Sequence, residues 1–264
     1  MFNTKNKIKK KKSPIKDNPL RYPGQSLDEE IKRILDDEIL EYGFISIVFV
    51  MFALLEWWRW YKQLPPFPVV FTIFAVGIVI YSFFKIRKSF KKIRKLKLGR
   101  DGEKVVGQYL DTLREKGCKV FHDIVGSGFN IDHVIISKHG IFALETKTYS
   151  KPEKGKAIIN YLGDKISING YEPERDPIIQ AKAISTEIKE ILKSSTGKDY
   201  LIRPVVLFPG WYIEPKSANS NKDVWVLNPK ALAAFIENQP VILTQEDVKL
   251  AEYHMSRHIR TTKK

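Results

Sequence analysis

Residues 130–147, NIDHVIISKHGIFALETK, contain two apolar runs separated by the short link Ser-Lys-His-Gly, which is typical of a hairpin turn. Successive side chains of a strand point to opposite faces, so Glu145 and Lys147 share one face of the second strand. A turn that is symmetric about residues 138 and 139 places Asp132 directly opposite Glu145. A three-residue loop would shift this pairing by one position. The stretch therefore predicts a hairpin with two facing carboxylates and a nearby lysine.

Two facing carboxylates repel each other, and a hard divalent cation such as Mg²⁺ or Mn²⁺ removes that cost because it prefers oxygen ligands. Lys147 would orient or deprotonate an attacking water, or stabilise negative charge on a phosphate. A bound cation lowers the pKa of water and neutralises charge in the transition state. These groups suit phosphodiester hydrolysis. The three residues alone are better explained by an ordinary half-exposed strand, with Asp132 as a strand-end residue, since Glu-x-Lys is a common pattern.

The sequence on both sides of the hairpin predicts an α/β domain that begins near Gly99. Helices are expected at 101–116, 177–194, 229–237 and 244–258. Strands are expected at 119–124, 130–137, 140–148, 202–208 and 223–227, with a further hairpin at 156–169. Strands grouped with helices on either side indicate a sheet covered on both faces.

Several short motifs occur in a fixed order across this domain. Gly102-Glu103 opens a helix, Ile131-Asp132-His133-Val134 precedes the Glu-Thr-Lys strand, and Asp176-Pro177-Ile-Ile-Gln180 begins a later helix. Arg203-Pro-Val-Val-Leu-Phe-Pro-Gly210 then supplies a core strand. This order resembles the nuclease-related domain (NERD) family, a branch of the PD-(D/E)xK nuclease-like superfamily, over roughly residues 98–210.

The resemblance implies a restriction-endonuclease-like mixed sheet flanked by helices. It also implies that Glu103, Asp132 and Glu145 surround the metal, that Lys147 is the catalytic lysine, and that Gln180 lies at the site edge. From the sequence alone, Glu103 is as well explained as a first-turn carboxylate favoured by the helix dipole. Gln180 is as well explained as a surface residue of its helix.

Two apolar runs precede the domain, at 44–61 and 67–84. Eighteen helical residues span roughly 27 Å, which is close to the hydrocarbon thickness of a bilayer. The second run has no charged residue, and the first ends in the aromatic sequence Trp-Trp-Arg-Trp-Tyr, which is typical of a membrane interface. The Pro65-Pro66 link predicts an antiparallel transmembrane hairpin. The alternative is a pair of buried helices in a soluble domain.

The net charge of +15 is concentrated around this hairpin. Residues 1–100 contain 21 Lys and Arg against 9 Asp and Glu, whereas residues 101–264 contain 24 against 21. By the positive-inside rule, both termini and the nuclease domain are expected in the cytosol, and the basic flanks are expected to contact anionic lipid. Cys118 is the only cysteine, which excludes an internal disulfide and fits a reducing compartment.

The predicted organisation has five parts. A basic tail (1–25) is followed by an amphipathic juxtamembrane helix (26–41), the transmembrane hairpin (43–84), a basic linker (85–98) and the NERD-like domain with its C-terminal helices (99–264). Ser-Leu-Asp-Glu at 26–29 has the form of a capping box. The amphipathic helix is expected either on the inner leaflet or in a dimer interface.

Three functions fit these features. The first is a membrane-anchored, metal-dependent nuclease with DNA as the expected substrate. The second is a catalytically silent binding or scaffold protein that keeps a nuclease-like fold. The third is a membrane-surface assembly factor. The joint presence of Asp132, Glu145 and Lys147 favours the first, and the small net charge of the domain argues against tight non-specific DNA binding by the domain itself.

Overall fold

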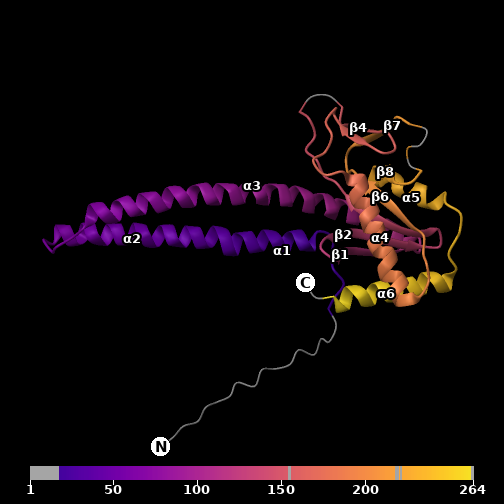
Figure 1. Cartoon of the computed structure of the whole chain (residues 1–264), viewed down its shortest axis with the longest axis horizontal. Helices are drawn as coiled ribbons and strands as arrows, with labels where there is room; N and C mark the ends of the chain where they lie inside the picture. The colour runs from indigo at the N-terminus through magenta and orange to yellow at the C-terminus, as the bar shows by residue number, and fades with distance from the viewer. Residues whose placement is uncertain (1–17, 154–155, 218–219, 221, 263–264) are drawn as a thin grey trace, which may run out of the picture.

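The computed structural model describes residues 18–153, 156–217, 220 and 222–262. A long helical hairpin projects from one end of an α/β domain (Figure 1). Most of the predicted basic tail lies outside the described residues.

A five-stranded mixed sheet forms the centre of the domain, in the order β1-β2-β3-β6-β8. Its strands are β1 (Lys119–Val125), β2 (Asn130–Ser137), β3 (Gly140–Thr146), β6 (Ile202–Leu207) and β8 (Trp225–Leu227). β1, β2 and β3 form an antiparallel meander, and β3, β6 and β8 run parallel. The predicted mixed α/β fold is confirmed.

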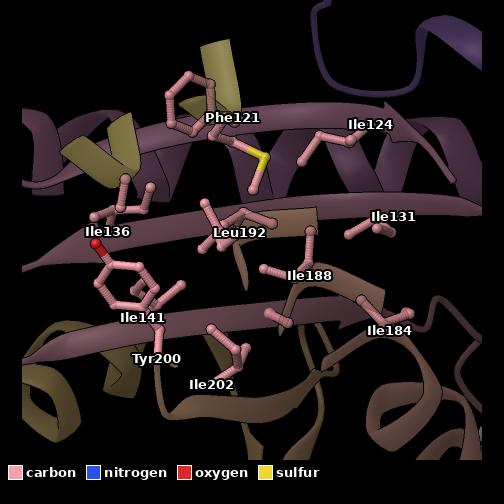
Figure 2. Close-up of a cluster of buried hydrophobic side chains, with 14 of the residues drawn as sticks. Phe121, Ile124, Ile131, Ile136, Ile141, Ile184, Ile188, Leu192, Tyr200 and Ile202 are labelled. Carbon is pink, nitrogen blue, oxygen red and sulfur yellow. The ribbon is translucent and has the colours of Figure 1, made fainter. Parts of the chain in front are cut away.

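Helices cover both faces of this sheet. The C-terminal part of α3 (Pro68–Glu115) and α5 (Pro229–Glu237) pack on one face, where Val106, Leu110 and Phe142 are buried. On the other face α4 (Pro177–Thr196) and α6 (Gln245–Thr261) bury a second cluster. Figure 2 shows side chains of α4, including Ile184 and Ile188, facing those of β1, β2 and β3. Burial on both faces explains why these strands are almost uniformly apolar.

A second, three-stranded sheet lies beyond the carboxyl ends of β3 and β6, in the order β5-β4-β7. Its strands are β4 (Ile158–Tyr161), β5 (Ile166–Ile168) and β7 (Tyr212–Pro215). The predicted hairpin at 156–169 corresponds to β4 and β5. β7 was not expected from the sequence, and it pairs with β4 in parallel.

The hairpin consists of two long helical arms. The first arm is continuous through α1 (Gln25–Arg33), the π-helical segment η1 (Ile34–Leu40) and α2 (Glu41–Tyr61). The second arm is α3, which also enters the domain. Both arms are long and apolar enough to cross a membrane, judged by length and composition. Their apolar stretches are mostly exposed, in contrast to the core helix of a soluble domain.

The basic segment 85–98 is helical and continuous with both the apolar and the domain parts of α3. Two apolar residues of the amphipathic helix in the first arm, Ile31 and Ile34, are buried against Ile93 of α3. This face of the amphipathic helix is therefore covered by the chain itself. The parts of the two arms that lie nearest the domain, α1 with η1 and residues 85–98 of α3, form a helical stalk between the apolar hairpin and the domain.

The capping box predicted at 26–29 is wrong. Helix α1 begins at Gln25 with Gly24 at its N-cap, and no side chain caps it. The hydroxyl of Ser26 donates a hydrogen bond to Asp123 of β1 instead. A tertiary contact has replaced the local one, because the start of α1 lies against the sheet.

Candidate active site

The β2–β3 hairpin has the register that the sequence predicted. His133 pairs with Leu144, Ile135 with Phe142, and Ser137 with Gly140. Continuing this register by one residue places Asp132 opposite Glu145. The backbone N–H of Thr146 donates a 2.7 Å hydrogen bond to Asp132 Oδ2, which ties that carboxylate to the end of β3. The side chains of Asp132 and Glu145 thus belong to the α4 face of the sheet, as do Val134 and Ala143.

Glu103 approaches from the other side of the sheet because α3 passes very close to the end of β3. A Cβ at Gly102 would lie 1.7 Å from Oγ1 of Thr148, so only glycine permits this approach. Glu103, the next residue, is buried at 8% exposure. The close contact therefore brings a third carboxylate toward the residues at the end of β3.

Burial and mutual repulsion disfavour the ionised forms of these acids. The pKa of Glu103 is raised to about 8, chiefly by burial and then by the negative charges of Asp123 and Glu145. The pKa of Asp132 is raised well above its usual value, again by burial first and then by Glu145 and Glu103. Asp132 keeps some exposed surface while its carboxylate is enclosed by protein. The three carboxylates therefore interact electrostatically.

Lys147 supplies positive charge within this group. Its Nζ donates a 2.5 Å hydrogen bond to Glu145 Oε1, and both side chains are largely buried. The ammonium lies where an oxygen-seeking cation would contact Glu145. It also lowers the pKa values of Asp132 and Glu103, although burial outweighs this effect.

Several buried polar atoms of β3, of the residues just after it and of α4 have no hydrogen-bond partner among the described residues. They include Oγ1 of Thr146, Oγ1 of Thr148 and Oε1 of Gln180. Gln180 lies in the first turn of α4, which packs on β3 and β6. No contact joins Gln180 to the acids, so its place at the site edge stays a prediction. Unpaired buried polar groups of this kind are satisfied by water or a ligand.

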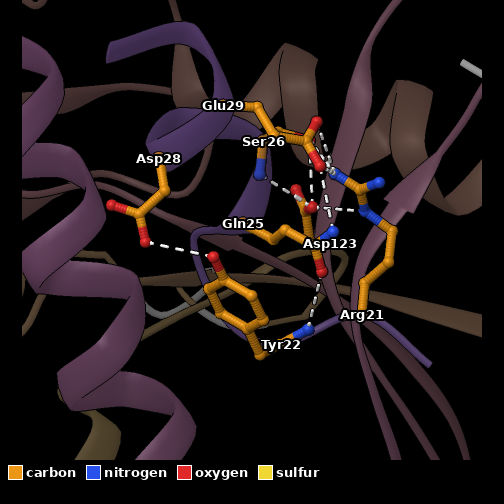
Figure 3. Close-up of polar contacts among 7 residues, drawn as sticks. All are labelled: Arg21, Tyr22, Gln25, Ser26, Asp28, Glu29 and Asp123. Carbon is orange, nitrogen blue, oxygen red and sulfur yellow. Dashed lines mark hydrogen bonds and ion pairs between the residues drawn. The ribbon is translucent and has the colours of Figure 1, made fainter. Parts of the chain in front are cut away.

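The N-terminal segment adds residues that sequence reasoning missed. Asp123 of β1 is buried and has a left-handed backbone with φ of 49°. It accepts hydrogen bonds from Arg21 Nε at 2.6 Å and from the backbone N–H and hydroxyl of Ser26, both at 2.9 Å (Figure 3). The backbone N–H of Gly24 bonds to Glu103. The β1–β2 register steps over Asp123 and Asp132, which interrupts the regular pairing at both acids.

The donor chemistry fits a hard divalent cation, with one restriction. Within the described part of the chain, no three His, Cys, Asp or Glu side chains form a ready set of metal ligands. Mg²⁺ is commonly held by one or two carboxylates together with waters and substrate phosphate. Asp132 and Glu145 meet that requirement, since both are acids forced close together in a buried place. Glu103 would join them only through water or a small movement.

Two histidines occupy the opposite, α3 face of the sheet. His122 Nδ1 and His133 Nδ1 are 2.8 Å apart, and the Arg114 guanidinium lies 3.2 Å from His122 Nε2. Burial lowers the pKa of His122 to about 4, with Arg114 adding to the effect. The pKa of His133 is also lowered strongly, first by burial and then by His122. Both rings are therefore neutral at physiological pH and act as packing groups.

Residues 98–209 match the model of the nuclease-related domain, NERD. The resemblance predicted from the hairpin motifs is confirmed, and the matched residues include Glu103, Asp132, Glu145, Lys147 and Gln180. The apolar hairpin lies outside the matched residues.

Two individual proteins are also similar to this chain. An uncharacterized protein of Bacillus anthracis is 29% identical over 86 residues. The aligned part covers 31% of this chain and 39% of that protein, so the chain spans about two fifths of its relative's length. The structure of Pyrococcus furiosus SfsA in complex with Ca²⁺ is 18% identical, covers 43% of each chain and has a TM-score of 0.24.

Proposed function

We propose that this protein is a membrane-anchored nuclease of the PD-(D/E)xK type that hydrolyses phosphodiester bonds, with DNA as substrate and Mg²⁺ or Mn²⁺ as cofactor. The observation that carries the proposal is the buried pair Asp132 and Glu145 on a NERD-matching hairpin, with Lys147 bonded to Glu145. Facing buried acids are costly in an ordinary strand and useful around a cation.

Each residue has a separate role in this proposal. Asp132 and Glu145 would hold the cation, with Glu103 as the third acid beside them. When bound, the cation would act as a Lewis acid that acidifies water and neutralises phosphate charge. Lys147 leaves Glu145 for the attacking water or a phosphate oxygen once the carboxylate charge is otherwise compensated. Gln180 orients water or substrate at the edge of the site.

The membrane part of the proposal rests on the two apolar arms and their flanks. The arms cross the bilayer as a hairpin, and both termini and the NERD domain lie in the cytosol. Arg59 and Lys62 are the cations of the outer link, against nine Lys and Arg at 85–100. The basic residues next to the apolar arm, Lys85 and Arg87, contact anionic lipid.

A cleavage assay on the purified full-length protein tests the proposal. Supercoiled plasmid and labelled oligonucleotides are incubated with Mg²⁺, Mn²⁺ or chelator. Lys147→Met should reduce turnover by about 100-fold or more while DNA binding is retained, because a group used in the transition state affects rate more than affinity. Glu145→Gln should remove metal binding and cleavage together. Lys138→Met, at the far turn of the same hairpin, is the matched control and should cleave normally.

A catalytically silent scaffold is the second candidate. It is favoured by the ion pair that already occupies Glu145, whose Oε1 accepts a hydrogen bond from Lys147 Nζ. Wild-type protein that binds DNA yet leaves it intact with every divalent ion tested would establish this alternative. Protein that neither binds nor cuts would favour the membrane-assembly factor.

A further inference from the structure

We propose that DNA reaches the site along α3, on a lysine stripe formed by Lys88, Lys91 and Lys95, in the space between the bilayer and the NERD domain. This inference rests on the proposed nuclease function and names the surface that guides its substrate. The stripe lies outside the residues matched by the NERD family.

Helical spacing places the three lysines on the face of α3 that later packs against the sheet. Residues three and four apart on a helix lie on the same face. From Lys88 the series runs through Lys91, Lys95 and Leu98 to Gly102 and Val106. Gly102 contacts Thr148 at the end of β3, and Val106 is buried in the domain. The stripe is therefore the exposed continuation of a face that leads straight to the site.

The distances suit a bound strand of nucleic acid. At 1.5 Å per residue, Lys95 lies about 10 Å from Gly102 along the helix axis, and Lys88 lies about 21 Å away. Phosphates follow one another along a DNA strand at about 3.4 Å in projection. A strand that follows the helix from the site thus meets the stripe at roughly its third to sixth phosphates.

The stripe lysines are free to bind phosphate, unlike Lys92 and Arg100 of the same helix. Lys92 pairs with Glu30 at 2.7 Å, and Arg100 pairs with Asp28 and Asp101. Among the described residues, by contrast, no carboxylate lies within ion-pair distance of Lys88, Lys91 or Lys95. All three side chains are exposed. Lys92 and Arg100 face the first arm of the stalk, with which they form ion pairs. The three stripe lysines lie on the side of α3 that the first arm leaves exposed.

Lipid does not account for the whole stripe. If the bilayer ends near Phe84, Lys91 is about 10 Å and Lys95 about 16 Å beyond it along α3. The Debye length at physiological ionic strength is about 8 Å, so these two residues lie outside the strong part of a lipid surface potential. Because the stalk is a continuous helix packed on α1, it holds them away from the headgroups.

The experiment compares two double variants of the full-length protein in zwitterionic nanodiscs. K91Q/K95Q removes two stripe lysines. R94Q/K97Q removes two exposed, unpaired cations of the same helical segment, at similar distances from the bilayer but on other faces. Binding of a fluorescein-labelled DNA oligonucleotide is measured by anisotropy in chelator over a series of salt concentrations. Omitting divalent ions separates binding from cleavage.

K91Q/K95Q should lower the slope of log K against log salt by about 2 and weaken binding roughly tenfold at moderate salt. R94Q/K97Q should bind nearly as tightly as wild type. Equal losses in both variants, no loss in K91Q/K95Q, or no DNA binding by wild type would each overturn the stripe. Wild type that cleaves while K91Q/K95Q binds and cleaves normally leaves the nuclease proposal standing without the stripe. DNA binding that depends on the stripe lysines, without cleavage by wild type, would support the stripe and contradict the nuclease proposal.

Discussion

At the scale of single residues, the acids near the end of the β2–β3 hairpin lie in an environment that disfavours their ionised forms. Glu103 and Asp132 are buried beside Glu145, and burial is the largest cause of their raised pKa values. Neither Lys147 nor the Gly24 N–H offsets this cost. A protein without use for these acids would be more stable with neutral side chains there. The arrangement is explained if a cation binds and replaces the protons.

Metal binding should therefore release protons. With a pKa of about 8, Glu103 is mostly protonated at pH 7 in the metal-free protein, and the raised pKa of Asp132 also favours its protonated form. We expect Mn²⁺ binding at pH 7 to release protons, about one of them from Glu103, because carboxylates bind metal in the ionised form. Calorimetric titrations in two buffers of different ionisation enthalpy measure this number. Release of no protons would show that the cation binds elsewhere.

The same site predicts a thermal shift that depends on Asp132. Mn²⁺ should raise the unfolding temperature of the wild type, because ligand binding to the folded state stabilises it by mass action. Asp132→Asn keeps the shape of the side chain and removes a ligand charge, so the shift should vanish. An unchanged rise of the unfolding temperature in this variant would show that the cation binds away from the β2–β3 hairpin. The metal-free variant should unfold no lower than wild type, because a neutral amide avoids the cost of ionising a buried acid.

The histidine pair on the α3 face of the sheet predicts that the free energy of unfolding depends on pH. The pKa of His122 is about 4 in the folded protein against an ordinary value of 6.5. The neutral form is therefore favoured by folding, so the stabilisation is complete above pH 6.5 and is lost as the pH falls through 4. Linkage gives roughly 3 kcal/mol for such a shift. His122→Phe should flatten this decline in denaturant unfolding curves, whereas parallel wild-type and variant curves would contradict the assignment.

Much of the site could be predicted from sequence, and the limit has a physical cause. Asp132, Glu145 and Lys147 are local to one hairpin, so strand alternation and turn symmetry are enough to relate them. Asp123 depends on a left-handed residue and on partners about 100 positions earlier, Arg21 and Ser26. No local pattern encodes such a contact. The capping box at 26–29 was predicted wrongly for the same reason, because Ser26 bonds to the distant Asp123.

At the scale of elements, α3 determines how the domain meets the stalk. Its 48 residues run from the apolar hairpin through the basic segment into the NERD domain. The strands and domain helices were predictable because each carries its own periodicity. The continuity of α3 was not, since Gly99 and Gly102 suggested a break where the composition changes. β7 was missed because it has four residues and its partner β4 lies about 50 positions earlier.

Gly102→Ala tests the contact between α3 and β3. The new Cβ would clash with the Thr148 side chain, and we expect a loss of about 1–3 kcal/mol in unfolding free energy, together with weaker metal binding. Gly77→Ala, in the same helix, meets nothing within 4 Å and is the matched control. Gly102→Ala combined with Thr148→Ala should recover part of the loss. A Gly102→Ala variant as stable as the control would refute the close approach.

At the scale of the whole molecule, the stalk places the candidate site on the side of the domain that faces the apolar hairpin. Gly24, Ser26 and Glu103 lie where both arms join the sheet. From Phe84 to Glu103 the helix rises about 28 Å. If the apolar hairpin crosses a bilayer as proposed, a substrate would enter between the bilayer and the domain, at a height that the helix sets. This geometry requires that the domain and both termini share one side of the membrane.

Cysteine labelling tests that orientation, because Cys118 is the sole cysteine and is buried. We introduce one accessible cysteine at a time into the full-length protein, Gln63→Cys in the link between the arms or Lys138→Cys on the domain surface; both positions are exposed. In intact bacteria, a membrane-impermeant maleimide should label Gln63→Cys and leave Lys138→Cys unmodified until the cells are lysed. Wild type, with Cys118 alone, measures the background.

The pattern of labelling decides between the possible arrangements because the two positions lie at opposite ends of the molecule. Labelling of Lys138→Cys in intact cells would place the domain outside and reverse the orientation. Protection of Gln63→Cys in intact cells, followed by labelling after lysis, would mean that the link does not cross. The apolar arms would then lie in one leaflet or against a partner, and the site would be held much nearer the headgroups than a spanning hairpin allows.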